Sequence, residues 1–195
     1  MDLSKYTVGF AMTGSFCTFS AALDVLKALI GTGAKIVPIL SPTAYSTDTR
    51  FGAAEDFRDR ITELCGRDIV HTIDAAEPIG PKKLLDALLV LPCTGNTLTK
   101  IALGITDTSV TMAAKAHLRN ERPLLVAVST NDALSGSAKN IGALLNTKNV
   151  YFVPMRQDDF RKKPRSVVAD FSQALPALQA ALEGKQLQPI FSAPQ

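Results

Sequence analysis

The stretch ALLVLPCTGNTLTK (87–100) carries the clearest information about the fold. Its first half is an unbroken apolar run, which is typical of a strand buried on both faces of a parallel sheet. We expect Pro92 to end this strand, because proline has no N–H to donate to a neighbouring strand. A small polar loop follows, and helical spacing begins at Leu98. A buried strand that leads through a polar loop into a helix is the repeating unit of a doubly wound α/β fold.

The same unit recurs in both directions along the chain. Further strands are expected at 7–12, 35–40, 68–73, 124–128 and 149–154. Helical spacing is found at 23–30, 53–65, 98–103, 108–120, 138–145 and 166–182, and the last helix is expected to break near Pro176. The sequence therefore predicts one domain over residues 1–195, a three-layer Rossmann-like α/β fold with helices on both faces of a parallel sheet.

Composition excludes several classes of protein. The chain has 195 residues, 46% of them hydrophobic, and a net charge of only +3, which does not suggest a nucleic-acid-binding protein. The three cysteines, Cys17, Cys65 and Cys93, are far apart and form no C-x-x-C pair, so we expect reduced thiols and no metal site. No apolar run is long enough to cross a membrane, and the first residues do not resemble a signal peptide. We expect a soluble cytoplasmic protein.

Four loops that follow predicted strands are rich in hydroxyl and amide side chains and almost free of charge. In an open parallel sheet, ligands bind at the carboxyl ends of the strands, where such loops meet. A site built this way holds its ligand with backbone N–H groups and neutral side chains. The loops are TGSF (13–16), SPTAYST (41–47), PCTGNT (92–97) and STND (129–132).

The first of these loops has the features of an anion site. Gly14 lets the backbone approach a ligand closely, and the Ser15 hydroxyl adds a donor at the start of a helix, where free N–H groups attract phosphate. Ser41 and Thr43 could complete the site from the next strand. The alternative is that Gly14 only turns the chain and that Ser15 or Thr18 caps the helix.

The third loop offers a different set of contacts. Thr94 and Gly95 form a tight turn that a flat ring or a phosphate could approach. Asn96 has both donors and an acceptor, which suit the polar edge of a ring. Thr97 can cap the helix that begins there. The alternative is an ordinary strand-to-helix loop in which Asn96 or Thr97 serves as the cap.

Residues 92–116, PCTGNTLTKIALGITDTSVTMAAKA, resemble the P-x-x-x-N-T…K-x-A-x-G-x-x-D segment of the homo-oligomeric flavin-containing cysteine decarboxylase family. TGSF (13–16) is similar to the family's first phosphate-binding loop. STNDAL (129–134) lies where the family has P-x-M-N-x-x-M, with Asn131 at the asparagine, which makes Asn131 the candidate catalytic residue. The resemblance implies that flavin mononucleotide (FMN) is held by Gly14, Ser15, Phe16, Ser41, Thr43, Thr94, Gly95, Asn96, Thr97, Ser129 and Asn131.

A narrower resemblance is to a branch of this family whose members form one component of an NADP-dependent oxidoreductase. It implies a partner subunit that carries NADP, a small dicarboxylate substrate, and a homo-oligomer of three chains or a multiple of three. Arg50, Arg156 and Lys163 are candidates to bind the carboxylates, although these residues could instead form a solvated loop or an interface with the partner. The blocks that carry the resemblance are 46–52, 76–82, 94–100, 129–134, 144–154, 157–164 and 186–190.

The sequence also departs from the decarboxylases of the family. Neither His71 nor His117 lies in their H-V-x-L context, and the methionines of P-x-M-N-x-x-M are missing. We expect both histidines to be structural, which argues against decarboxylation. Two alternatives to the oxidoreductase component stay open. One is a non-catalytic stabilising partner without flavin, and the other is an FMN-dependent decarboxylase or prenyltransferase of the wider family.

Overall fold

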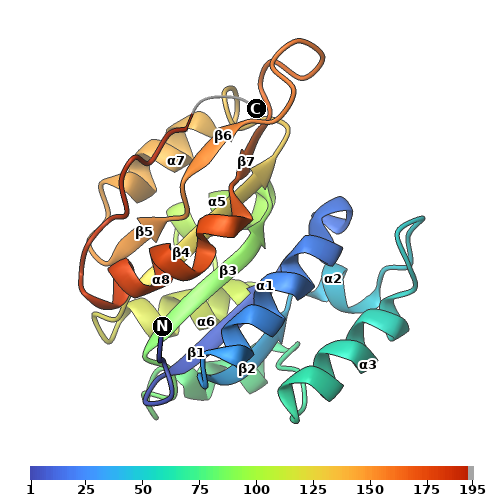
Figure 1. Ribbon diagram of the computed structural model, residues 1–195, viewed down its shortest axis with the longest axis vertical. Coiled ribbons are helices and arrows are strands. Elements are labelled where there is room, and N and C mark those ends of the chain that lie inside the picture. Colours follow the sequence, from blue (N-terminus) through green and yellow to red (C-terminus); the bar gives the residue numbers. More distant parts are fainter. Residues whose placement is uncertain (193–195) are drawn as a thin grey trace.

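Within residues 1–192, which the computed structural model describes, seven strands form one sheet in the order β2-β1-β3-β4-β7-β6, and β5 also pairs with β4 (Figure 1). The first five strands are mutually parallel, whereas β7 runs antiparallel to both β4 and β6. The strands are β1 (Thr7–Met12), β2 (Lys35–Leu40), β3 (Ala87–Cys93), β4 (Leu124–Thr130), β5 (Val150–Phe152), β6 (Met155–Gln157) and β7 (Val167–Ala169).

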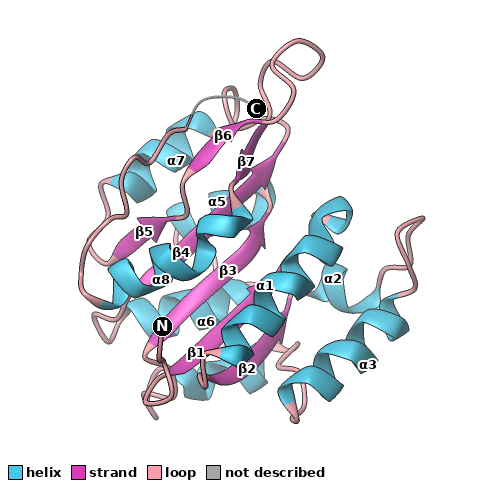
Figure 2. Ribbon diagram, in the orientation of Figure 1, coloured by secondary structure: helices cyan, strands magenta, loops and turns pink. Residues whose placement is uncertain are grey.

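Helices cover both faces of this sheet (Figure 2). On one face pack α1 (Phe19–Gly31), α3 (Ala54–Cys65) and α8 (Ala174–Leu182), and on the other α4 (Ile73–Ala76), α5 (Gly95–Ala102), α6 (Ser109–Leu118) and α7 (Ala138–Leu145). The remaining helices are α2 (Pro42–Ser46) and the short 3₁₀ helices η1 (Phe16–Thr18), η2 (Glu77–Ile79) and η3 (Phe171–Gln173).

Alternation along β3 explains why the sheet is buried on both faces. Leu89 and Leu91 pack in the core under α1 and α8, while Leu88 and Val90 pack in the core under α6 and α7. Successive side chains of a strand point to opposite faces, so an unbroken apolar run supplies two cores at once. The expected three-layer Rossmann-like α/β fold is confirmed. None of the helices in residues 1–192 has the length and apolar character that crossing a membrane requires.

The predicted strand at 68–73 is wrong. Only Val70 joins the sheet, through a single bridge to Ile39, and α4 begins at Ile73 after the side chain of Thr72 caps it. The Val70 N–H donates to the carbonyl oxygen of Pro38 at 2.9 Å. Pro38 lies on the edge strand β2, where its missing N–H is tolerated.

Two further expectations need correction, and both concern proline. Strand β3 continues through Pro92 to Cys93, and the Pro92 carbonyl accepts the N–H of Thr13 at 3.2 Å. The expected helix over 166–182 begins with strand β7 and becomes α-helical only at Ala174. Pro176 lies in the first turn of α8, where no N–H is needed, so it does not break the helix.

The direction of chain progression through the sheet reverses between β1 and β3. From β1 the chain moves outward to β2, and it then returns to β3 on the other side. Ligand sites of open α/β sheets lie at such a switch point, outside the carboxyl ends of the two strands. Two segments project on either side of this edge: the teal loop between α2 and α3, and the orange loop between β6 and β7 (Figure 1).

Candidate ligand-binding site

A cavity of about 640 Å³ opens at the switch point, and we call it the switch-point cavity. Its walls come from the loop after β1, the end of β4, the loop between α2 and α3, and the β6–β7 hairpin. The predicted site residues that line it are Gly14, Ser15, Phe16, Arg50, Thr94, Ser129, Asn131 and Lys163. Its lining also includes Cys17, Thr18, Phe51, Thr130, Asp158, Ser166, Val167 and Val168, which sequence reasoning did not assign to a site.

Thr13 fastens the two loops of the switch point to each other. Its hydroxyl donates to the Pro92 carbonyl at 2.8 Å and accepts the Thr94 N–H at 2.9 Å. The side chain is only 1% exposed, so these bonds are shielded from water. Sequence reasoning missed Thr13, because the partner that explains it lies 79 residues away in the chain.

The loop after β1 leaves several backbone donors free. The Ser15 N–H donates to the carbonyl oxygen of Thr13 at 2.7 Å. Within residues 1–192, the N–H groups of Gly14, Phe16 and Cys17 have no acceptor. Neither Ser15 nor Thr18 caps the following helix with its side chain, so that alternative is wrong. Free N–H groups at the start of a helix are suited to an anion.

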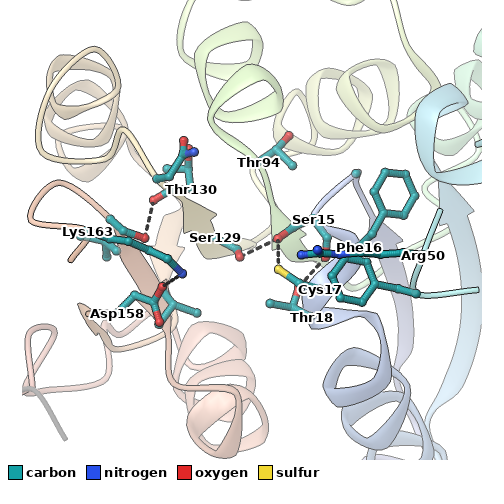
Figure 3. Close-up of a pocket in the computed structure, with 16 residues that line it drawn as sticks. Ser15, Phe16, Cys17, Thr18, Arg50, Thr94, Ser129, Thr130, Asp158 and Lys163 are labelled. Carbon is teal, nitrogen blue, oxygen red and sulfur yellow. Dashed lines mark hydrogen bonds and ion pairs between the residues drawn. The ribbon is translucent and has the colours of Figure 1, made fainter. Parts of the chain in front are cut away.

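Polar side chains join the walls of this cavity. The hydroxyls of Ser15 and Ser129 are 2.8 Å apart, which links the loop after β1 to the end of β4 (Figure 3). Lys163 and Arg50 lie on opposite sides of this serine pair (Figure 3). Lys163 Nζ is 2.9 Å from the Asp158 carboxylate. The cavity therefore has an uncharged centre with one cationic side chain at each side.

Six predicted residues do not line this cavity, and four of them have structural contacts instead. Ser41 caps α2, with its hydroxyl accepting the Ala44 N–H at 3.2 Å. Thr43 packs against Gly14, since a Cβ on that glycine would lie 3.2 Å from the Thr43 methyl. Thr97 is buried, and Thr94 rather than Asn96 or Thr97 caps α5. Arg156 lies 3.8 Å from the carboxylate of Asp170.

Gly95 and Asn96 line a second cavity of about 570 Å³ on the far side of Thr94, Thr130 and Asn131, which border both. We call it the α5 cavity. A carboxylate that sequence reasoning missed, Asp132, lies in its lining. Its Oδ1 accepts the hydroxyls of Thr130 at 2.6 Å and Ser137 at 3.0 Å.

Two cysteines and both histidines lie outside the cavities, in structural surroundings. Burial raises the pKa of the Cys93 thiol to about 12 and that of Cys65 to about 11, so neither is a thiolate nucleophile at neutral pH. Burial also lowers the pKa of His117 to about 4, and its ring bonds the Pro123 carbonyl at 2.9 Å. His71 stacks on Tyr45, with ring centres 3.8 Å apart. The described residues hold no group of three His, Cys, Asp or Glu side chains placed for a metal ion.

These observations define a class: a doubly wound α/β protein with a cavity at the switch point that is lined by free backbone donors and hydroxyls. The family model named Flavoprotein matches residues 1–169, and the chain belongs to the flavoprotein family. It is 42% identical over 189 residues to the B subunit of dipicolinate synthase from Bacillus subtilis (strain 168), an alignment that covers 97% of this chain and 94% of that protein. The resemblance found in the sequence is thereby confirmed.

Solved structures agree with this placement. The crystal structure of the dipicolinate synthase B subunit from Bacillus halodurans C matches with a TM-score of 0.91 and 41% identity over 98% of both chains. A dodecameric FMN-dependent UbiX-like decarboxylase from Escherichia coli O157:H7 matches with a TM-score of 0.63 and 25% identity, covering 76% of this chain and 79% of that one. The narrow branch and the wider family therefore share this fold.

Proposed function

We propose that this chain is the flavin-binding B subunit of a dipicolinate synthase. Together with the NADP-binding A subunit of that enzyme it oxidises a dihydrodipicolinate to dipicolinate, in the mother-cell cytoplasm of a sporulating bacterium. The observation that carries the proposal is the 42% identity to a dipicolinate synthase B subunit over 97% of the chain. The switch-point cavity is the site that this function would use.

The residues present fit flavin mononucleotide. The unpaired N–H groups of Gly14, Phe16 and Cys17 would hold the phosphate, with the Ser15 hydroxyl beside them. At about 640 Å³ the cavity lies within the range of small-molecule sites, which is about 300–1,000 Å³. When bound, flavin would supply an acceptor for the hydride or electrons that leave the substrate.

The cationic side chains would hold the substrate. Arg50 and Lys163 approach the cavity from opposite sides, so each could bind one carboxylate of a dicarboxylate. Lys163 would exchange Asp158 for the substrate carboxylate. Asn131, which borders both cavities, would orient the ring with its amide. Arg156 is less suited to this role, because it lies beside Asp170.

Reconstitution with the NADP-binding partner tests the function. Product formation that depends on NADP should require this chain and should rise when FMN is added. A full rate with flavin-free protein would favour the non-catalytic stabilising role instead. The switch-point cavity does not support the decarboxylase alternative, because neither His71 nor His117 is among the residues that line it.

Gly14→Val tests the flavin site directly. The new side chain would press on Thr43 and Phe16 and displace the loop that offers the free N–H groups, so FMN affinity should fall about tenfold or more. FMN fluorescence titration measures this. Gly31→Val is the matched control, because a Cβ at Gly31 meets nothing within 4 Å. Equal FMN affinity in both variants would count against the site.

A further inference from the structure

Two exposed phenylalanines lie at the mouth of the switch-point cavity, on the two segments that project beyond the sheet (Figure 1). Phe51, in the loop between α2 and α3, is 45% exposed, and Phe160, in the loop between β6 and β7, is 48% exposed. Single exposed apolar side chains are common on protein surfaces and need no explanation. These two differ, because the segments that carry them lie on opposite sides of one cavity.

Each phenylalanine has an arginine over its ring. The guanidinium carbon of Arg50 is 4.9 Å from the ring centre of Phe51, and the guanidinium carbon of Arg161 is 5.6 Å from the ring centre of Phe160. Such cation–π contacts restrict the directions in which both partners point. Aromatic side chains and arginine are enriched in protein–protein interfaces and among the residues that contribute most to binding. Both sides of the mouth therefore have the composition of an interface.

The loop over residues 158–165 is held in shape by its own acidic side chains. The Asp158 carboxylate lies 2.9 Å from Lys163 Nζ, which closes the loop across its base. Asp159 Oδ1 accepts two backbone N–H groups of the same loop, at 3.2 and 3.0 Å. A loop that is ordered before it binds loses less conformational entropy on binding. Phe160 is therefore presented to solvent by a loop that is already organised.

Three cations of this loop have no acidic partner. Arg161, Lys162 and Arg165 are exposed, and none of them forms an ion pair with a carboxylate of residues 1–192. Together with Phe51 and Phe160 they form a surface that we call the cavity rim. Its positive charge attracts an acidic surface and repels a second copy of the same rim.

The proposed function requires that another protein covers this opening. Electron transfer between a flavin in the switch-point cavity and NADP on the A subunit brings the two rings nearly into contact. The NADP site of the A subunit must then face the mouth of the cavity. The surface around that mouth is the part of this chain that the A subunit has to contact.

We propose that the cavity rim is the docking surface for the NADP-binding A subunit. The matching surface of that subunit presents acidic side chains to the three cations and an apolar recess to each phenylalanine. Phe51 and Phe160 supply most of the binding energy, while the cations accelerate association by electrostatic attraction. The inference rests on the proposed function for the identity of the partner.

Biolayer interferometry between this chain and the purified A subunit tests the inference. Phe160→Ala should raise the Kd about tenfold or more, because it removes an aromatic contact that is buried only in the complex. Leu84→Ala is the matched control. Leu84 is 43% exposed but precedes β3, at the opposite end of the sheet, so its Kd should equal that of the wild type. An unchanged Kd for Phe160→Ala would overturn the inference.

Charge reversal tests the role of the cations. Arg161→Glu combined with Lys162→Glu should slow association about tenfold and weaken its dependence on salt concentration. Lys35→Glu combined with Lys82→Glu makes the same change in net charge at the amino end of the sheet, where both lysines are exposed. This control should leave the association rate within about twofold of the wild type. Equal slowing in both double variants would make the effect one of net charge and would overturn the docking site.

The same variants exclude other occupants of the cavity rim. Phe160, Arg161 and Lys162 do not line the switch-point cavity, so the FMN affinity of their variants should equal that of the wild type. Light scattering of this chain alone should give one mass for Phe160→Ala and for the wild type, and a smaller mass for the variant would assign the rim to contacts between copies. Weaker NADP binding to the complex, with unchanged affinity between the two subunits, would assign the cations to the nucleotide. Either result would overturn the proposal.

This inference and the proposed function fail in different ways. If the wild-type chain binds the A subunit and supports product formation, and the rim variants do the same with equal affinity, the docking surface alone is wrong. If the A subunit binds through the rim but the complex forms no product with NADP and FMN, the proposed activity alone is wrong.

Discussion

Gly95 is the residue on which the geometry of the α5 cavity depends most directly. A Cβ at this position would lie 2.7 Å from the Thr130 hydroxyl, 2.8 Å from Asp132 Oδ1 and 2.9 Å from the Ser137 hydroxyl. Real Cβ atoms do not approach other atoms so closely, so only glycine lets the carboxylate and its two hydroxyl partners pack against the start of α5. The glycine is required here for space, and not for an unusual backbone angle.

Gly95→Ala should therefore destabilise the fold by about 1–3 kcal/mol, since the added methyl group overpacks a filled site. Chemical denaturation measures the change. Gly142→Ala is the matched control within α7, where a Cβ meets nothing within 4 Å, and it should stabilise by about 0.5–1 kcal/mol through helix propensity. If both variants changed the free energy of unfolding in the same direction, this explanation would be contradicted.

His117 gives the molecule a pH-dependent stability. Burial lowers its pKa to about 4 in the folded chain, against 6.5 for an exposed histidine, so the unfolded chain binds the proton first. The contribution of His117 to the free energy of unfolding is therefore fully present above pH 6.5. It decreases as the pH falls toward 4, by about 3 kcal/mol in total. His117→Gln should flatten the slope of unfolding free energy against pH in this window. An unchanged slope would assign the acid sensitivity to other groups.

The residues of the site were predictable to different degrees. Gly14, Ser15 and Thr94 follow strands in the sequence, so their place at the switch-point cavity could be anticipated from the rule on carboxyl ends. Asp132 could not, because a single carboxylate after a strand looks like any loop residue until its partners at Thr130 and Ser137 are seen. Capping was also assigned to the wrong residues, since hydroxyl side chains at neighbouring positions have the same propensity for it.

At the scale of elements, the segment after α8 closes the outer edge of the sheet. The Gln186 side chain takes the place of a strand against β5: its Oε1 accepts the Phe152 N–H at 2.8 Å, and its Nε2 donates to the Phe152 carbonyl at 2.8 Å. Later in the same segment, the carbonyl oxygen of Ile190 accepts the N–H of Met155 at 2.9 Å. Covering an edge in this way keeps other chains from pairing with it.

Gln186→Ala should cost about 2 kcal/mol or more, because it leaves both polar groups of a buried Phe152 backbone without partners. Hydrogen exchange at the Phe152 amide should quicken as well. Gln179→Ala, on the exposed side of α8, should change stability by no more than about 0.5 kcal/mol. If the two variants were equally stable, the side chain would not be acting as a strand partner.

Apolar periodicity was sufficient to predict the long elements but not the short ones. Strands β1, β2 and β3 are long and buried, so their runs are unambiguous, and the expected helix at 138–145 coincides with α7. The three-residue strands β6 and β7 were missed, because strands this short leave no clear apolar pattern; β7 pairs with β4, and β6 pairs with β7. In 68–73 the apolar alternation suggested a strand where only one residue pairs.

For the whole molecule, we expect a homo-oligomer with a mass of three times 20.8 kDa or a multiple of it. A dodecameric relative shares the fold, and large apolar side chains are exposed on this chain, among them Leu103 at 65% and Leu134 at 51%. Light scattering measures the mass, and a monomeric value would contradict the expectation.

The switch-point cavity joins parts of the chain that are far apart in sequence. The loop after β1 provides one wall and the β6–β7 hairpin provides another, and β7 joins this hairpin to the sheet by pairing with β4. An occupant therefore couples the first and last thirds of the protein energetically. Any compound with higher affinity for the folded state should raise the midpoint of thermal denaturation of the entire chain in a single cooperative step, by an amount that grows with its free concentration.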